Sequence, residues 1–366
     1  MIVFAKQVLN VSVVLASLFF VGCAHQSHIK PLDSQAKYDK ARTRNNFDDY
    51  VNFLKGKALG EGISETTLYQ NKDIRYVDKA IDLDRQQAGR VKKSTSHQPI
   101  RSNPNGTTNY LNRVLTPRKV AVAENHYRDK HAQIEKASQR FGVQKEYLMS
   151  LWGMESSFGD YQGNYDVLSV LATLAFEGRR ELLFSREFIA AMKMLERQDI
   201  SRQKMLGSWA GAMGQTQFMP SSYLRYAADG NQDGEKDIWK NHDDVFASIA
   251  SYLSTVGWDK TLPWGIEVYL TQPLSLDLSG IEQDKKRTLQ VWQQLGVKLK
   301  SSSPQNQEKL TALSTTDLWL VRPDREVGRA FLVSNNYRTL LNWNRSNYFA
   351  VSIGMFADRI KQQVGL

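Results

Sequence analysis

The chain of 366 residues is 41% hydrophobic and 10% aromatic, so it can bury a large core, and its length favours two or three lobes. Its 48 lysines and arginines against 38 acidic residues give a net charge of +10, which suits an anionic partner such as an envelope polymer or a membrane surface. Because the basic residues are scattered rather than gathered in one stripe, we expect no nucleic-acid partner.

The first residues are typical of an export signal. An apolar run from Val11 to Val21 is shorter than the ~20 apolar residues that a spanning helix needs, and it leads into Gly22 and Cys23. The stretch Phe20-Val21-Gly22-Cys23 resembles the lipobox of bacterial lipoproteins, whose cysteine becomes the lipidated first residue. We therefore expect a signal peptide over 1–22 and lipidation of Cys23, the only cysteine of the chain; an ordinary signal peptide is the alternative. Since no aspartate follows the cysteine, the pattern implies a periplasmic protein anchored to the outer membrane.

Three segments follow the signal. Residues 23–46 are polar and lack apolar periodicity, so they predict a flexible tether, with order beginning near Phe47. Apolar residues at helical spacing predict a small helical lobe over 47–87. The stretch 92–109, rich in Ser, Asn, Pro and Gly, predicts a loop.

A long helix is predicted from Pro117 to Gly142, and the helix after it carries an acidic residue on its apolar side. One face of that second helix consists of residues three or four apart: Leu148, Leu151, Trp152, Glu155 and Phe158. A carboxyl group there is expensive to ionise, so its pKa should rise and it should carry a proton near neutral pH, as a general acid requires. Pairing with an arginine or capping a backbone group accounts for a buried glutamate equally well.

A second stretch follows two helices predicted over 166–174 and 181–195. It reads Ser208-Trp209-Ala210-Gly211-Ala212-Met213-Gly214-Gln215-Thr216-Gln217-Phe218-Met219-Pro220-Ser221-Ser222. Its glycines allow tight turns and close approach, while Ser208 and Gln217 offer side-chain hydrogen bonds. Such a loop can line a sugar groove, although composition alone favours tight packing between helices.

Together, Trp152-Gly153-Met154-Glu155-Ser156 and the stretch that begins at Ser208 resemble the signature of the lytic murein transglycosylase B family, whose members cleave peptidoglycan. The resemblance extends from about Phe47 to Ile360 and includes Asn342-Trp343-Asn344-Arg345-Ser346. It implies a catalytic region over 47–366 with an α+β, mainly α fold. Its lysozyme-like helical core spans 110–260, a small β-containing lobe spans 261–340, and the chain returns to the core over 341–366.

The resemblance makes Glu155 the sole catalytic acid and base. Most glycosidases use two carboxylates, and no obvious second acidic residue accompanies Glu155 in its motif. In the implied reaction Glu155 protonates the oxygen between N-acetylmuramic acid and N-acetylglucosamine and then takes the proton of the 6-hydroxyl, which leaves a 1,6-anhydro end. A lysozyme-type hydrolase and a non-catalytic peptidoglycan-binding lipoprotein remain as alternatives.

The resemblance also assigns residues that bind the glycan strands of peptidoglycan. Ser208 should hydrogen bond to Glu155, and the following positions should contact the glycan: Gln217, Tyr110, Tyr252, Trp343, Asn344 and Phe349. Trp343 and Phe349 stand where family members carry tyrosines, so they keep ring stacking and lose the hydroxyls. Core packing is the alternative for each of these residues alone. Cell-wall synthases are plausible protein partners.

The acidic loop from Asp229 to Trp239 matches the calcium loop of an EF-hand, with oxygen-bearing side chains at positions one, three, five and nine and glycine at six. Lys240 stands at position twelve, where an EF-hand has a bidentate glutamate. In the family the last ligand comes later, which favours Asp244 over Asp243. We expect a structural calcium ion held within 229–244 by Asp229, Asn231, Asp233, Glu235 and Asp244, and no cofactor for the chemistry. A solvated turn is the alternative.

Short strands and helices alternate in the C-terminal third of the chain. Alternating and apolar runs predict strands over 266–270, 318–321 and 330–333. Helical spacing predicts a short helix over 289–295 and a final helix over 348–364.

Overall fold

The computed structural model of the protein describes residues 29–90, 103 and 105–366. The predicted signal peptide, the predicted lipidation site Cys23 and most of the loop predicted over 92–109 lie outside these residues. The helices are α1 Phe47–Gly60, α2 Glu65–Gln70, α3 Asp78–Arg90, α4 Gly106–Val114, α5 Pro117–Asp129, α6 His131–Phe141, α7 Lys145–Ser156, α8 Val167–Glu177, α9 Glu181–Glu196, α10 Pro220–Tyr226, α11 His242–Thr255, α12 Leu289–Gln294, α13 Pro304–Leu313, α14 Asn335–Trp343 and α15 Asn347–Val364. The strands are β1 Tyr165–Asp166, β2 Leu206–Gly207, β3 Gly265–Leu270, β4 Arg287–Thr288, β5 Val297–Leu299, β6 Asp317–Val321 and β7 Ala330–Val333.

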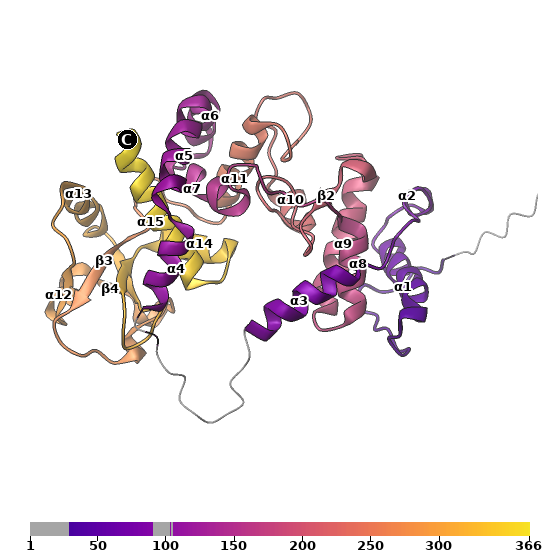
Figure 1. The fold of residues 1–366 in the computed structure, drawn as a ribbon, viewed down its shortest axis with the longest axis horizontal. Coiled ribbons are helices and arrows are strands. Elements are labelled where there is room, and N and C mark those ends of the chain that lie inside the picture. The colour runs from indigo at the N-terminus through magenta and orange to yellow at the C-terminus, as the bar shows by residue number, and fades with distance from the viewer. Residues whose placement is uncertain (1–28, 91–102, 104) are drawn as a thin grey trace, which may run out of the picture.

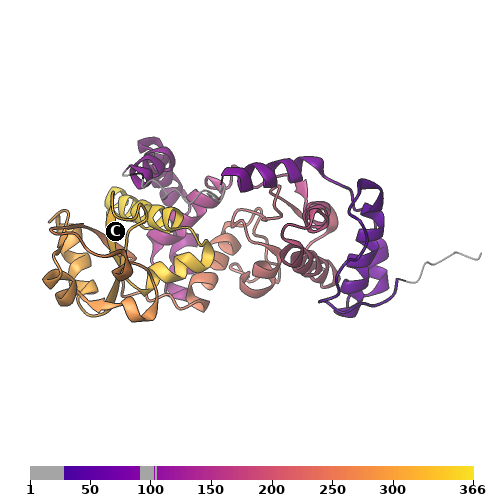
Figure 2. The same ribbon diagram turned by 90° about the horizontal axis from the view of Figure 1, so that it is seen from below.

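The molecule is elongated, with α1, α2 and α3 at one end and the larger β-sheet at the other (Figures 1 and 2). Helices α8 and α9 lie beside the N-terminal helices, whereas α4 to α7, α14 and α15 lie toward the sheet. The N-terminal end is therefore built from two separate segments of the chain, α1 to α3 and then α8 and α9. The fold is mainly helical with a small antiparallel sheet near the C-terminus, as predicted.

The described part of the predicted tether packs on the helices. The backbone N–H of Leu32 donates to a carbonyl of α1 at 2.9 Å, and the ring of Tyr38 lies against two aromatic rings of that helix. Arg42 forms an ion pair with Glu181 of α9. The prediction of a flexible tether over 23–46 is therefore wrong for residues 29–46. Single contacts, separated along the chain, hold this extended segment on the helices. Contacts of this kind leave no helical spacing in the sequence.

The helices predicted over 47–87 bury their apolar faces on α8 and α9. Phe47 of α1 packs on Phe176 of α8 with ring centroids 5.5 Å apart. In the segment before α3, the backbone N–H of Val77 donates to Thr173 of α8 at 3.1 Å. One continuous hydrophobic core therefore joins these helices to the middle of the chain.

The long helix predicted from Pro117 to Gly142 is two helices, α5 and α6, that meet at Lys130. Thr116 caps α5 by accepting from a backbone N–H at 3.2 Å, and Pro117 lies in the first turn, as expected. Gly142 ends α6 with a φ of 66°, a left-handed conformation that costs glycine little. The break at Lys130 was missed because neither proline nor glycine marks it. Helix α4 was also missed, and its first turn occupies the end of the predicted loop.

The larger sheet has five antiparallel strands in the order β4-β6-β7-β3-β5. All three predicted strands are present, and the predicted helix over 289–295 is α12. Trp292 of α12 is fully buried in a second hydrophobic core on one face of this sheet. Strands β4 and β5 and helix α13 were missed because they are short or polar, so their apolar pattern is too brief to recognise.

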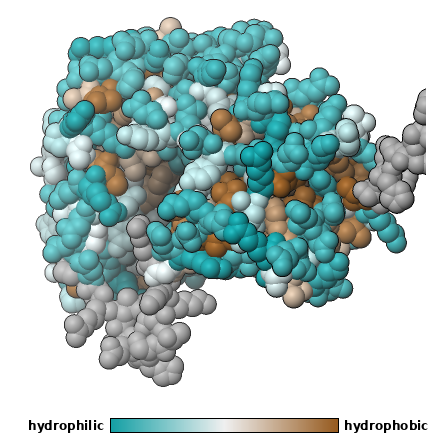
Figure 3. Space-filling model, turned by 45° about the vertical axis from the view of Figure 1, so that its right-hand side comes forward, coloured by the Kyte–Doolittle hydropathy of each residue, from teal (hydrophilic) through white to brown (hydrophobic). Residues whose placement is uncertain are grey.

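The face of the molecule in Figure 3 is mostly hydrophilic, with hydrophobic side chains in a hollow and in separate patches. Two leucines in the first turn of α9 are exposed, Leu182 at 48% and Leu183 at 44%. Within the described ranges, no helix has both the length and the apolar character needed to span a bilayer.

Candidate functional site

Helix α7 ends in a sharp turn immediately after Glu155. Ser157 and Phe158 both have positive φ values, 50° and 64°. The turn places the Phe158 ring over Gly153, where an added Cβ would lie 2.6 Å from the ring. Phe158 is therefore not on the helical face predicted for it, although it is buried beside the same helix.

Glu155 is half-buried, and its carboxyl group receives one side-chain hydrogen bond. The indole N–H of Trp343, at the end of α14, donates to Glu155 Oε1 at 2.7 Å. Burial raises the pKa of Glu155 to about 7, and the Trp343 hydrogen bond opposes part of that rise. Its described contacts include no lysine or arginine, so a structural ion pair does not account for it. A carboxyl group with this pKa can both give and take a proton near neutral pH.

Aromatic side chains from other parts of the chain surround Trp343. Its ring centroid lies 4.6 Å from that of Tyr252 on α11 and 5.3 Å from that of Phe218. Tyr252 in turn lies 4.4 Å from Tyr226 of α10. Burial raises the pKa of Tyr252 to about 12, so its hydroxyl stays neutral and keeps its donor. These buried rings support Trp343, whose ring contacts the carboxyl group.

The hydroxyl of Ser208 stabilises its own loop. Ser208 Oγ accepts from the backbone N–H groups of Ala210 and Ala212, at 3.3 and 3.1 Å. In this structure the side-chain hydrogen bond to Glu155 comes from Trp343, and not from Ser208 as predicted. A tryptophan was expected to stack and to lose the tyrosine hydroxyl, and its own N–H donor was overlooked.

Gln215 joins α7 to the same loop, and sequence analysis did not single it out. Its Oε1 accepts from the indole N–H of Trp152 at 2.7 Å, and its Nε2 donates to the carbonyl of Trp239 at 2.9 Å. Trp152 lies one helical turn before Glu155, so this bond holds the helix in position. The sequence contained a clue to this contact. A buried indole N–H needs an acceptor, and the stretch that begins at Ser208 supplies side-chain amides.

The other predicted binding residues lie at different depths. Tyr110 of α4 is half-buried, burial raises its pKa, and its ring centroid lies 5.6 Å from that of Tyr348. Gln217 has a φ of 50° and donates to two backbone carbonyls, at 2.8 and 3.2 Å. Asn344 is exposed where α14 ends, and Phe349 is buried in the core. Phe349 therefore packs in the core, which was the alternative to its predicted contact with the glycan.

The acidic loop over 229–244 has turns like those of a cation-binding loop, but its side chains are not gathered. Asp229 accepts from the backbone N–H of Gly234 at 2.8 Å. The buried Asp244 accepts from two backbone N–H groups, at 2.7 and 2.8 Å, and Asn231 donates to Asp233 at 2.7 Å. Within the part of the chain that the structure describes, no three acidic, histidine or cysteine side chains are close enough to hold a metal ion. Glu235 lies exposed at the loop surface, so in this conformation the acidic side chains of the loop do not converge on one point.

Comparison with known proteins gives consistent results over most of the chain. Residues 46–358 match the family model described as the transglycosylase SLT domain. Over 172 residues the chain is 37% identical to the membrane-bound lytic murein transglycosylase B of Escherichia coli, an alignment that covers 46% of each protein. The chain thus matches less than half of the length of that relative.

Solved structures extend the match. SltB3 from Pseudomonas aeruginosa in complex with NAG-anhNAM-pentapeptide aligns with a TM-score of 0.73 and 33% identity, over 86% of this chain and 79% of that one. The lytic transglycosylase Slt35 of Escherichia coli in complex with calcium aligns with a TM-score of 0.70 and 22% identity, over 90% of this chain and 100% of that one. At that identity the second likeness concerns the fold alone.

Proposed function

The chain belongs to the transglycosylase SLT domain family, and from this membership we propose that it is a lytic transglycosylase of peptidoglycan. It cleaves the β-1,4 bond between N-acetylmuramic acid and N-acetylglucosamine and leaves a 1,6-anhydro end. The observation that carries the proposal is Glu155, half-buried beside an aromatic wall with its pKa raised to about 7.

Glu155 begins the reaction as an acid. Oε1 already accepts from the Trp343 indole, so Oε2 is the oxygen that carries the proton. Glu155 delivers that proton to the glycosidic oxygen, the bond from that oxygen to the anomeric carbon breaks, and the bonding electrons stay with the leaving sugar. The N-acetyl group of the substrate supports the positive charge that develops, as in substrate-assisted glycosidases.

Glu155 ends the reaction as a base. The 6-hydroxyl oxygen of the N-acetylmuramic acid forms a new bond to the anomeric carbon of that sugar, and the hydroxyl proton passes to the Glu155 carboxylate. The Trp343 N–H stabilises that carboxylate during the interval in which it is charged. No water is consumed, and the enzyme is returned to its protonated state.

Two alternatives lead to different products. A lysozyme-type hydrolase would need a second carboxylate or a positioned water, and the described contacts of Glu155 include no second carboxylate. A non-catalytic scaffold would bind peptidoglycan and release nothing.

Mass spectrometry of the muropeptides released from purified peptidoglycan distinguishes the transglycosylase, the hydrolase and the scaffold. We expect anhydro ends from a soluble chain lacking residues 1–23, and none from its Glu155→Gln variant. Glu146 of the same helix is also buried with a raised pKa, so Glu146→Gln is a matched control that should keep turnover. Reducing ends would establish hydrolysis, turnover by Glu155→Gln would remove Glu155 from the chemistry, and no product from the unmodified chain would favour the scaffold.

For location, we propose export to the periplasm and anchoring to the outer membrane through a lipid on Cys23. The support is the lipobox-like stretch Phe20-Val21-Gly22-Cys23 and the absence of any other cysteine in the chain. Fractionation of cells that express the full chain or its Cys23→Ala variant tests this. The full chain should sediment with outer membranes and the variant should not; a soluble full chain would contradict the anchor. Cell-wall synthases are the proposed protein partners, because they act on the same polymer.

For the acidic loop, we propose that calcium binds only after Asp229, Asp233 and Asp244 turn away from the groups that they now contact. A protein of the same fold was solved with calcium, and the loop retains EF-hand spacing, although Lys240 replaces the bidentate ligand. Calcium should raise the melting temperature of the chelated protein, and Asp233→Asn, at an exposed position, should weaken that rise. No shift with calcium would reject the proposal.

A further inference from the structure

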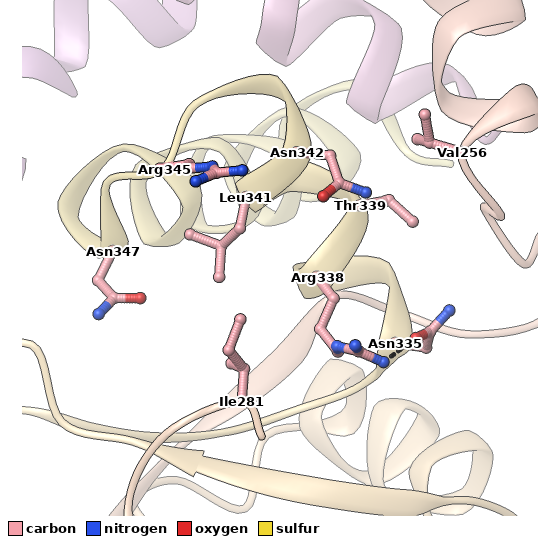
Figure 4. Close-up of a pocket in the computed structure, with 9 residues that line it drawn as sticks. All are labelled: Val256, Ile281, Asn335, Arg338, Thr339, Leu341, Asn342, Arg345 and Asn347. Carbon is pink, nitrogen blue, oxygen red and sulfur yellow. Dashed lines mark hydrogen bonds between the residues drawn. The ribbon is translucent and has the colours of Figure 1, made fainter. Parts of the chain in front are cut away.

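A cavity of about 540 Å³ lies beside α14 (Figure 4). Most of its wall comes from α14 and the residues that follow it, and Ile281 and Val256 close it from other segments. Arg338 and Arg345 supply its charge. None of the nine described residues that line it is acidic, so the cavity is polar and carries a positive charge.

The guanidinium of Arg338 is held by side-chain amides and an aromatic ring. Its described contacts include no carboxylate. It donates to Asn335 Oδ1 at 3.3 Å. In the amide orientation that satisfies both ends of Gln283, it also donates to that residue at 2.7 Å. Its guanidinium carbon lies 5.1 Å from the ring centroid of Trp319. Among the described residues its buried Nε has no hydrogen-bond partner. The Nε is closed to solvent, but the terminal nitrogens carry four N–H groups and the two amides do not use all of them, so Arg338 keeps donors for an acceptor.

The cavity lies next to Glu155 along α14. Asn342 lines the cavity, and the next residue, Trp343, hydrogen bonds to Glu155. Thr339, one helical turn before Trp343, also lines the cavity. A peptide of five residues extends up to about 17 Å, which exceeds the width of about 10–12 Å of a helix, so one carried by a sugar at Glu155 is long enough to reach the cavity.

We propose that this cavity binds a carboxylate of the peptide stem that peptidoglycan carries on its muramic acid. The assignment rests on the proposed function, since that function brings a stem-bearing glycan to Glu155. Arginine and asparagine side chains match a carboxylate, through the charges of Arg338 and Arg345 and the side-chain amides of Asn342 and Asn347. Arg345 is exposed at the rim and adds a second cation. The cavity thus selects glycan strands that still bear acidic stems.

Binding can be measured without turnover. Calorimetric titration uses three probes: a synthetic pentapeptide stem with free carboxylates, the same peptide with its carboxylates amidated, and sodium acetate. We expect the acidic stem to bind at least about tenfold more tightly than the amidated one, as loss of a charge-assisted hydrogen bond predicts. Equal binding of the two peptides would overturn the proposal. Acetate binding as tightly as the acidic stem would point to a free-anion site and would also overturn it.

Variants locate the site. Arg338→Gln and Arg345→Gln should each weaken binding of the acidic stem and leave the amidated stem unchanged. Arg345→Gln changes an exposed side chain, so it keeps the test valid if Arg338→Gln, which loses its contact with Trp319, fails to fold. Arg128→Gln, an exposed arginine of α5 outside the cavity, is the matched control. Unchanged binding in both cavity variants would overturn the proposal.

Turnover separates this inference from the proposed function. With stem-bearing strands, the two cavity variants should raise KM about tenfold and keep kcat; with strands stripped of stems they should match the unmodified protein. An equal loss on both substrates, or no loss on either, would reject stem recognition and leave the transglycosylase assignment standing. Failure of the unmodified protein to cleave either substrate would reject the function itself, while the titrations would still report on the cavity.

Discussion

At the scale of single residues, the pKa of Glu155 depends on two opposing contacts. Burial raises it, and the indole N–H of Trp343 lowers it by stabilising the carboxylate. A general acid that must later act as a base performs best with a pKa near the ambient pH. The two contacts together leave Glu155 in that range.

The first prediction concerns the pH dependence of stability. The pKa of Glu155 rises from an ordinary 4.5 to about 7 on folding, so folding favours the protonated form. Its contribution to the free energy of unfolding is complete below pH 4.5 and is lost as the pH rises through about 7. Glu155→Gln, which stays neutral, should therefore be more stable than the unmodified protein by about 2 kcal/mol above pH 7, after a discount for partial exposure. Urea unfolding at several pH values measures this, and a difference that does not grow with pH would contradict it.

The second prediction concerns Trp343. Trp343→Phe keeps the ring and removes the N–H that lowers the pKa of Glu155. The basic limb of the pH–activity profile should therefore move up by about one pH unit, and kcat at neutral pH should fall about tenfold because the carboxylate loses its donor. Trp292→Phe, which removes a buried indole bond to the Leu318 carbonyl in the sheet, is the control and should leave the profile in place. An unshifted basic limb in Trp343→Phe would show that the bond does not tune Glu155.

At the scale of elements, the end of α7 decides where Glu155 points. The turn at Ser157 and Phe158 brings the Phe158 ring onto Gly153, and the ring of His126 of α5 stacks on it with centroids 4.9 Å apart. Only a residue without a Cβ leaves room for the ring. The glycine of the motif is thus explained by packing next to the catalytic turn.

The third prediction tests that packing. In Gly153→Ala the new Cβ meets Phe158 at 2.6 Å and Phe356 at 2.9 Å, so the turn must shift. We expect a loss of about 2 kcal/mol of stability and lower activity. Gly89→Ala in α3 is the matched control, because nothing lies within 4 Å of its added Cβ, and it should stabilise the protein by about 0.5–1 kcal/mol. Thermal melting and turnover assays measure both; an unchanged melting temperature in Gly153→Ala would refute the steric account.

At the scale of the whole molecule, the chain builds two hydrophobic cores and joins its ends through the larger one. That core runs from α1 through α7 to α15 and includes residues near both ends of the described chain, while the second core stays on one face of the sheet. Residues 29–46 attach to the first core through Tyr38 and Arg42. They therefore contribute to its stability.

The fourth prediction follows from those attachments. A chain that begins at residue 47 should melt several degrees below one that begins at residue 29, because it loses the Tyr38 packing and the ion pair of Arg42 with the half-buried Glu181. Its turnover on peptidoglycan should change little at low temperature, since Glu155 lies in a different part of the molecule. Differential scanning calorimetry compares the two chains. Equal melting temperatures would support the flexible tether predicted from the sequence.

Local patterns in the chain were sufficient to predict much of the architecture. Apolar periodicity identified α7, α8, α9 and α15, and the cap at Thr116 and the stop at Gly142 follow from backbone preferences that neighbouring residues impose. The apolar helical face predicted the raised pKa of Glu155, because a carboxyl group there is costly to ionise wherever the rest of the chain lies, and the family resemblance supplied its proposed role as the acid.

Contacts between distant segments could not be predicted in this way. Trp343 reaches Glu155 across 188 residues of sequence, and Gln215 reaches Trp152 across 63. No local pattern encodes such pairings, because they depend on how helices and loops pack in space. The same holds for the arginine-lined cavity beside α14 and for the packing of residues 29–46. Sequence periodicity thus determines which faces are buried, and tertiary packing determines which polar groups meet there.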